Sequence, residues 1–320
     1  MNKRIFFAPI ICVILYCVCT ALSFKMPFLS LLSPLLLMLF GAFALFKNSK
    51  ITLGVGCVLT ALVTLYINKD VAYSIVYTLG YVSAGFLLCY SILRKKGGAY
   101  ALVSTAILIL ISDYGAVAVS DLANGKHVLS FVDEMFNTLK PFVLEAINQN
   151  AGALGIENPN QIFDVYVMAV KMMLPAIVFI IVLIKSIILS FFVKIIVNKV
   201  FKCILVDLRF SMFKADGVTV FVFLISALIS MFAGDGVIAV VFGNIYMILS
   251  VVLMLCGISL LDWYLKDVQK VKTFFRFLLL LLVCASLLFP VLPMAFIVVA
   301  LIDARRNFRL SGSNTKGKQN

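Results

Sequence analysis

Charged and polar side chains inside long apolar stretches are the residues of this sequence with the most evident chemistry. Asp113 stands at the centre of Ile111–Gly115, within an apolar stretch from about Tyr100 to Ser120. A charged group inside a bilayer is costly, so it is expected to be paired or functional. Asp113 is therefore the first candidate for a site that binds a ligand, a proton or a second charged group.

Lys171 is the basic residue that the sequence suggests as its partner. It stands roughly two turns inside the next apolar stretch, as Asp113 stands roughly two turns from the end of its own. Because consecutive spans run antiparallel, we predict similar depths and an Asp113–Lys171 pair that neutralises both charges. The pair is either a ligand or proton site or a structural tether, and Lys171 alternatively extends to the outer surface. Lys185 and Asp262 stand near the ends of their stretches and are expected at the interface.

Asn244 is the third candidate, and it stands within a later apolar stretch, between Gly243 and Ile245. A polar side chain with apolar neighbours at membrane depth usually forms a hydrogen bond across a helix interface. Contact with a substrate is the alternative role.

No sequence motif of an enzyme accompanies these residues. The sequence has no G-x-x-x-x-G-K-[ST] phosphate loop, no H-E-x-x-H zinc motif and no G-x-S-x-G nucleophile elbow. Its one histidine, His127, has no cysteine nearby, and seven of the eight cysteines stand in apolar stretches without metal-binding spacing. We therefore expect no enzymatic activity, no catalytic residue, no cofactor and no metal site.

The composition indicates the elements that must position these groups. Of the 320 residues, 63% are hydrophobic and 13% are charged, against about 25% charged residues in soluble domains. A chain of this length cannot enclose so much apolar surface, so part of that surface must face lipid. We predict an all-α fold, a polytopic transmembrane helical bundle in the cytoplasmic membrane of a bacterium.

Eight apolar stretches are predicted to be full spans. They cover approximately residues 5–24, 27–46, 51–67, 71–93, 100–120, 165–192, 217–233 and 237–261. A further apolar region, 277–302, is broken by Pro290 and Pro293. It forms either a shallow hairpin or one long kinked span. Small residues such as Gly80, Ala84 and Gly85 are expected to allow close helix packing.

The spans and the polar segments divide the chain into four predicted regions. Residues 1–120 form an N-terminal five-span membrane region, 121–164 an extracytoplasmic amphipathic loop, 165–304 a C-terminal membrane region and 305–320 a basic cytoplasmic tail. The loop contains a helical pattern that Pro141 kinks or ends, and Asn158-Pro159 signals the start of the next helix. The loop helix is expected either to lie on the outer surface or to form a lid over a pocket.

The distribution of basic residues sets the predicted orientation. With the N-terminus in the cytoplasm, sixteen lysines and arginines fall on the inner side and four on the outer side, before the tail is counted. A cytoplasmic C-terminus then requires region 277–302 to be a hairpin. Because the basic residues of the net +13 chain stand at the ends of apolar stretches, we expect membrane anchoring and no nucleic-acid partner.

Three segments carry a family resemblance. They are the segment from Pro27 through Pro34 to Lys47, the segment from Asn244 to Cys256–Ser259, and the ending Ala300–Arg309. With these segments the chain resembles the YybS-like family of uncharacterised bacterial multi-pass membrane proteins. That resemblance implies a distant similarity to the substrate-binding S components of energy-coupling factor transporters, with a pocket open to the outside and Asp113 in its wall. The first span departs from the alanine pattern of those components.

Two functions are expected from these observations. The first is a small-solute transporter component that resembles an S component. The alternative is a non-transporting scaffold or regulatory protein that acts through the basic inner loops 194–216 and 266–276, although these loops also serve as topological anchors. The expected partners are membrane lipids, with a small-molecule ligand or other membrane subunits as further candidates.

Overall fold

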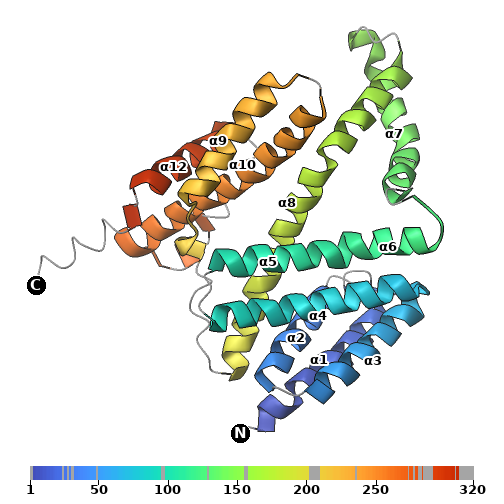
Figure 1. Ribbon diagram of the computed structural model, residues 1–320, viewed down its shortest axis with the longest axis vertical. Coiled ribbons are helices and arrows are strands. Elements are labelled where there is room, and N and C mark those ends of the chain that lie inside the picture. The colour runs from blue at the N-terminus through green and yellow to red at the C-terminus, as the bar shows by residue number, and fades with distance from the viewer. Residues whose placement is uncertain are drawn as a thin grey trace, which may run out of the picture. The chain divides into compact units, whose positions relative to one another are not determined.

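The computed structural model describes the chain as a set of helices (Figure 1). The described residues are 3–23, 25–26, 29, 32–47, 50–94, 98–127, 130–154, 158–201, 210–234, 236–272, 274–276, 278–279, 283, 291–306 and 308–309. None of these residues lies in a β-strand, and long apolar helices recur along the chain. The prediction of an all-α membrane fold is therefore confirmed.

Each of the eight predicted spans coincides with a helix. In chain order the helices are α1 (Lys3–Leu22), α2 (Ser33–Lys47), α3 (Lys50–Asn68), α4 (Val71–Leu93), α5 (Gly98–Leu110) continued by η2 (Ile111–Gly115) and α6 (Ala116–Ala123), α7 (Ser130–Leu154), α8 (Pro159–Phe201), η3 (Phe210–Met212), α9 (Gly217–Phe232), α10 (Val237–Trp263) continued by η4 (Tyr264–Val268), and α12 (Val291–Arg306). Four of them have the length and apolar composition to cross a membrane. Four more described apolar helices are shorter, so the count of eight crossings stays a prediction.

The described residues fall into two compact units. The first comprises Met1–Leu174 and Ile181–Asp207, and the second comprises Pro175–Ile180 and Leu208–Asn320. The four regions predicted from the sequence separate membrane segments from loops, and they stay predictions.

Glycines bring α2 and α4 of the first unit into backbone contact. A Cβ on Gly41 would lie 2.0 Å from the Val82 carbonyl oxygen, and a Cβ on Gly85 would lie 1.9 Å from the Met38 carbonyl oxygen. Both distances are shorter than any real contact, so the two helices can approach only because these positions lack side chains. The expected close packing at Gly85 is thus confirmed.

A helical hairpin of α7 and the first part of α8 extends from the first unit (Figure 1). Val132 and Phe136 of α7 and Phe163 of α8 are buried. Pro141 lies inside α7 and does not end it. The Asn158-Pro159 signal is confirmed, because α8 begins at Pro159 and the Asn158 side chain accepts a hydrogen bond from the Gln161 N–H at 3.3 Å.

Helix α8 is much longer than the predicted span. It has 43 residues and continues to Phe201, past the expected end near residue 192. The first residues of the predicted basic segment 194–216 therefore extend this helix, and residues 202–209 lie outside the described part of the chain.

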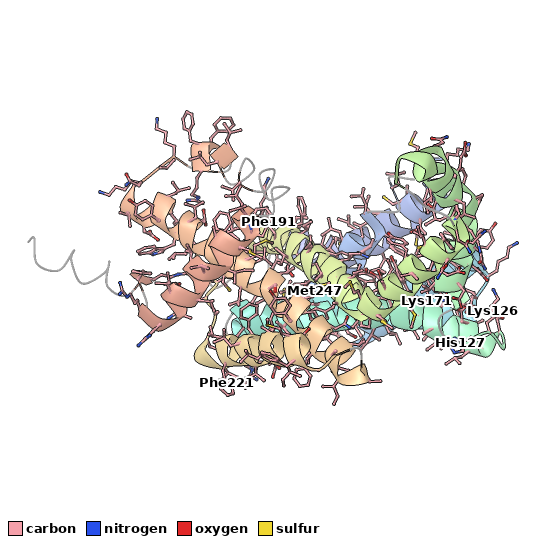
Figure 2. All side chains as sticks on the ribbon, turned by 90° about the horizontal axis from the view of Figure 1, so that it is seen from above. Lys126, His127, Lys171, Phe191, Phe221 and Met247 are labelled. Carbon is pink, nitrogen blue, oxygen red and sulfur yellow. The ribbon has the colours of Figure 1, made fainter. Side chains whose placement is uncertain are left out.

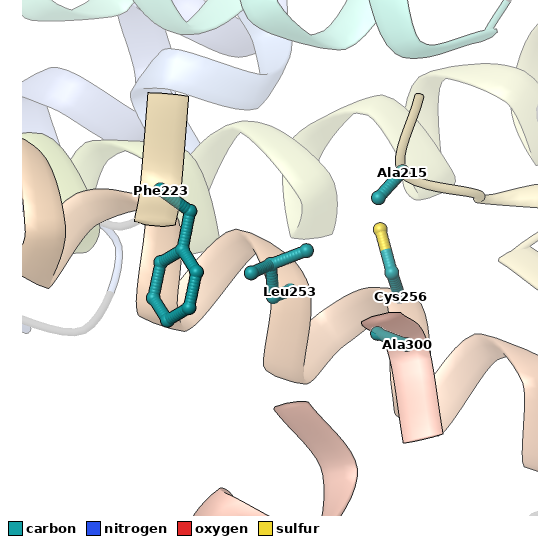
Figure 3. Packing of buried hydrophobic residues seen from close by; sticks show 5 residues of the cluster. All are labelled: Ala215, Phe223, Leu253, Cys256 and Ala300. Atoms are coloured by element: carbon teal, nitrogen blue, oxygen red, sulfur yellow. The ribbon is translucent and has the colours of Figure 1, made fainter. Parts of the chain in front are cut away.

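The second unit is built around α9, α10 and α12. Phe223 from α9, Leu253 and Cys256 from α10, and Ala300 from α12 form a buried cluster with Ala215 (Figure 3). Helix α9 begins at a capped turn, because the Asp216 carboxylate accepts a hydrogen bond from the Thr219 N–H at 2.8 Å. A side-chain hydrogen bond with Thr219, followed by this backbone hydrogen bond, lowers the pKa of Asp216 below its ordinary value.

Arg309, assigned to the basic tail by the sequence, belongs to the core of the second unit. Its guanidinium donates to the carbonyl oxygens of Ser211 at 2.7 Å and Phe213 at 2.6 Å, and its Nε lies 3.3 Å from the Asp303 carboxylate. Burial lowers the pKa of Arg309, and Asp303 opposes that shift. Most of residues 277–290 lie outside the described part of the chain, so the hairpin and the single span both stay predictions.

We predict that Gly85→Ala weakens the first unit by about 2 kcal/mol, because its methyl group forces α2 and α4 apart. Unfolding of the purified protein by dodecyl sulfate in mixed micelles, followed by circular dichroism, measures this. The control is Gly54→Ala, where a Cβ meets nothing within 4 Å. Equal stability of the two variants would contradict the backbone contact.

Candidate functional site

Asp113 is held by two polar side chains of the first unit. One carboxylate oxygen lies 2.6 Å from the Lys185 ammonium, and the other accepts a hydrogen bond from the Tyr81 hydroxyl at 2.6 Å. The three residues come from η2, α8 and α4. The predicted Asp113–Lys171 pair is therefore wrong, because Lys185 is the basic partner.

A π-helical turn presents the Asp113 carboxylate. The residues from Ile111 to Gly115 have this wider geometry between two α-helical segments, and such turns occur frequently at functional sites. The adjoining Ser112 packs directly on α4, where a Cβ on Gly80 would lie 2.0 Å from the Ser112 oxygen. Gly80 therefore brings η2 close enough for the Tyr81 hydroxyl to reach Asp113.

Lys185 occupies the interior of α8, and its expected interfacial position stays a prediction. The prediction placed the inner end of the span near residue 192, but the helix continues to Phe201. The next residue, Ser186, is buried and donates to the Leu102 carbonyl oxygen at 3.2 Å, which fixes this part of α8 against α5. The Lys185 ammonium also lies 5.2 Å from the centre of the Tyr81 ring, within the range of a cation–π interaction.

The ion pair is only partly covered by protein. The side chains of Lys185 and Asp113 keep 35% and 20% of their exposure, whereas Tyr81 is fully buried. The site thus combines a fixed aromatic hydroxyl with two charged groups that another molecule can reach.

A row of tyrosines on α4 connects this pair to the end of the helix. Tyr73, Tyr77 and Tyr81 recur every four residues and share one helix face. Their ring centres are 5.5 Å apart for the first pair and 4.9 Å for the second. Behind the row, the Tyr16 hydroxyl lies 2.6 Å from the Thr64 hydroxyl. This hydrogen bond joins α1 to α3, and the Thr64 hydroxyl also lies 3.3 Å from the Thr78 hydroxyl of α4.

Asp70 lies at the start of α4, just before Tyr73, the first tyrosine of the row. Its carboxylate accepts from the Tyr73 N–H at 2.8 Å, which caps the helix. It also accepts from the Ser120 hydroxyl and, at 3.3 Å, from the Asn124 amide. These bonds, that of Ser120 first, lower the pKa of Asp70 below its ordinary value of 3.8. Asp70 therefore joins the ends of α4 and α6 beside the tyrosines.

Lys171 lies on the α7–α8 hairpin, away from Asp113. Its ammonium is 2.5 Å from the Asp133 carboxylate, and both side chains are about half exposed. Figure 2 shows Lys171 toward the same end of the molecule as Lys126 and His127. Lys126 pairs with Glu134 at 3.1 Å, and this contact raises the pKa of Lys126. These two pairs connect the start of α7 to its surroundings at the surface.

The side chain of Asn244 forms hydrogen bonds with backbone groups of the second unit. Its carbonyl oxygen accepts from the Ala176 N–H at 2.9 Å, and its amide donates to the Val240 carbonyl oxygen at 2.8 Å. Ala176 directly follows Pro175, which lies inside α8 and interrupts the helical hydrogen bonds there. Asn244 thus makes the kind of interhelical hydrogen bond that the sequence suggested.

Sequence reasoning missed Tyr81 and did not identify Lys185 as the partner of Asp113. The spacing of Tyr73, Tyr77 and Tyr81 was a signal for a shared face, but their contact with Asp113 is between distant segments. The expected absence of a metal site remains a prediction, although no group of three metal-binding acidic, histidine or cysteine residues occurs among the described positions.

Comparison with known proteins identifies the family of the chain. Residues 10–304 match the family described as predicted membrane protein (DUF2232), so the chain belongs to this family. No curated protein and no solved structure matches it. The family description supports a membrane location and adds no activity.

We predict that Lys185→Met destabilises the protein by about 3 kcal/mol, because it leaves Asp113 uncompensated among apolar helices. Asp113→Asn combined with Lys185→Met restores most of that loss. Unfolding in mixed micelles measures the single and double variants. The control, Lys171→Met, changes stability by no more than about 1 kcal/mol, since its pair is exposed. The observed pairing would be refuted if Asp113→Asn offset the loss of stability caused by Lys171→Met and not the loss caused by Lys185→Met.

A second prediction concerns pH. A lowered pKa means that the charge of Asp70 stabilises the fold fully above about pH 4, and that this contribution is lost as the pH falls through the folded-state pKa. Asp70→Asn retains a good helix cap but cannot titrate. The stability advantage of the wild type over Asp70→Asn should therefore be constant at neutral pH and shrink below about pH 4. Denaturation at several pH values measures it, and parallel curves throughout would be the contrary result.

Proposed function

We propose that this protein is a non-enzymatic component of a small-solute transport system, and that its solute binds at Asp113 and Lys185, which Tyr81 helps to position. The observation that supports this is the incompletely covered ion pair inside an apolar helical unit. The family match gives the membrane location, and the transport role is our inference.

The energetics of the pair favour a functional role. Removing two charges from water is costly, and a buried ion pair seldom stabilises a fold more than apolar side chains of the same size. The unit has close glycine-mediated packing of α2 and α4 for its stability. A carboxylate and an ammonium kept in this environment are therefore best explained by a ligand that uses them.

The chemistry of the pair favours a zwitterionic solute. The carboxylate of such a solute can replace Asp113 beside the Lys185 ammonium, while its cationic group binds Asp113. This exchange replaces one opposite-charge contact with two and adds no net charge to an apolar site. The buried Tyr81 positions both charged groups for the solute, by its hydrogen bond to Asp113 and by its ring beside the Lys185 ammonium.

The row of tyrosines gives a route for approach. Tyr73 and Tyr77 are intermediate in exposure and present hydroxyl groups and ring faces between Asp70 and the ion pair. In the proposed orientation both termini are cytoplasmic and Asp70 faces the outside of a bacterial cytoplasmic membrane, because basic residues favour the opposite side. The resemblance to S components agrees with a site open to the outside.

The experiment is an unbiased mass-spectrometric search for small molecules that purify with the protein. We expect a zwitterionic solute with the wild type and at least about tenfold less of it with Asp113→Asn, because a hydrogen bond to a charged group is lost. Lys185→Met should have the same effect. The matched control is Asp133→Asn, which removes a surface ion pair of the hairpin and should retain the solute.

Folding of each variant is checked by its circular dichroism and elution volume. A solute that stays bound to folded Asp113→Asn would exclude the proposed site. Repeated absence of any solute from wild-type protein would instead favour the scaffold role through the basic loops.

A further inference from the structure

An apolar groove runs along the end of α10 in the second unit. It has a volume of about 430 Å³ and is lined by aliphatic and aromatic side chains of α10, η4 and α12, with Phe308 beyond them. Gly257 forms its base, since a Cβ there would lie 2.2 Å from the Phe296 carbonyl oxygen of α12. The two helices are thus in backbone contact beneath the groove.

The aromatic residues of the groove place it at the membrane–water boundary. Trp263 and Tyr264 stand where the apolar helix α10 passes into η4. These two residue types concentrate where the ends of membrane spans meet the lipid headgroups. An apolar groove at this depth faces the part of the acyl chains next to the headgroups.

Basic side chains follow the groove toward the water. Arg306, in the last turn of α12, stands seven residues after the lining residue Val299, so both lie on one helix face. Arg305 precedes it, and both arginines are exposed. Lys266 stands in η4 between the lining residues Tyr264 and Val268. Positive charge is therefore concentrated at the polar end of the groove.

Nearby carboxylates cancel this charge only in part. Asp262 lies 2.7 Å from the Arg276 guanidinium, and Asp303 lies 3.3 Å from that of Arg309. Each of these carboxylates has its own arginine. A third carboxylate, Asp267, directly follows Lys266 in η4. With Arg305, Arg306 and Lys266, the five basic residues here exceed the three carboxylates by two.

We propose that this groove binds an anionic phospholipid, with one acyl chain in the groove and the phosphate at Arg306 and Lys266. An apolar protein helix would match the groove equally well, but it would not match the basic residues at its end. Their charge selects a lipid with a net negative headgroup. This inference does not depend on the proposed solute site, which lies in the first unit.

Trp263 is the single tryptophan of the chain and gives the test a direct probe. The full-length protein is reconstituted in phosphatidylcholine vesicles that contain increasing amounts of brominated phosphatidylglycerol or, in parallel, brominated phosphatidylcholine. Bromine quenches tryptophan fluorescence on contact. We expect brominated phosphatidylglycerol to quench Trp263 at about a fivefold lower mole fraction, the effect of one basic side chain near a membrane surface.

Two variants separate the headgroup from the acyl chain. Arg306→Gln should remove most of the preference for phosphatidylglycerol, while Arg94→Gln, an arginine of the first unit, should leave it unchanged. Val299→Phe fills the groove and should weaken quenching by both lipids. Val298→Phe is its control, since the neighbouring Val298 does not line the groove and is 53% exposed.

Equal quenching by the two lipids that Arg306→Gln leaves unchanged would overturn the proposal. Absence of quenching by either lipid would also overturn it, since the groove would then be covered by protein. Light scattering in detergent would show whether that cover is a second copy of the chain. The emission maximum of Trp263 and the circular dichroism of each variant establish that it is folded.

Discussion

Pairing of charge in an environment of low dielectric constant is the constraint on which this structure depends. Three carboxylates of the described residues lie in or just after apolar helices and form ion pairs: Asp113 with Lys185, Asp262 with Arg276 and Asp303 with Arg309. Asp113 and Lys185 are distant in the sequence. In the other two pairs, the arginine stands in the segment that directly follows the helix of its aspartate. The Asp113–Lys185 pair joins η2 to α8, because an uncompensated charge among apolar helices would be far more costly than the contact. The other two pairs hold the segments after α10 and α12 against those helices.

The periodic and local features of the sequence predicted the helices well. Each of the eight predicted apolar stretches coincides with a helix, Asn158-Pro159 predicted the start of α8, and Gly85 marked a close helix contact. Helix ends were predicted less well. An apolar stretch ends where the side chains become polar, but the backbone hydrogen bonds of the helix can continue through polar residues. Helix α8 therefore extends past its predicted end through residues such as Lys194 and Lys199.

That difference in length explains the error at the candidate site. Depth was counted from the start of the apolar stretch near Val165, which placed Lys171 opposite Asp113. In the structure this part of α8 packs with α7 as a hairpin, and the later residue Lys185 reaches the carboxylate. Tyr81 was beyond prediction for another reason: its contact with Asp113 depends on how α4 and η2 pack, which no local pattern encodes. Arg309 likewise has the sequence of an exposed tail and the contacts of a core residue.

The π-helical turn at Ile111–Gly115 makes the site sensitive to insertion and deletion in a way that ordinary substitution would not reveal. Such a turn contains one residue more than the α-helix that replaces it. Loss of a single residue there would restore regular α-helix and rotate the following segment by about 100°. The span would keep its hydrophobic length and still insert, yet Ser120 would turn away from Asp70. Among natural variants of this chain, a one-residue deletion at this position would thus mark proteins that retain the membrane fold but have lost the polar site.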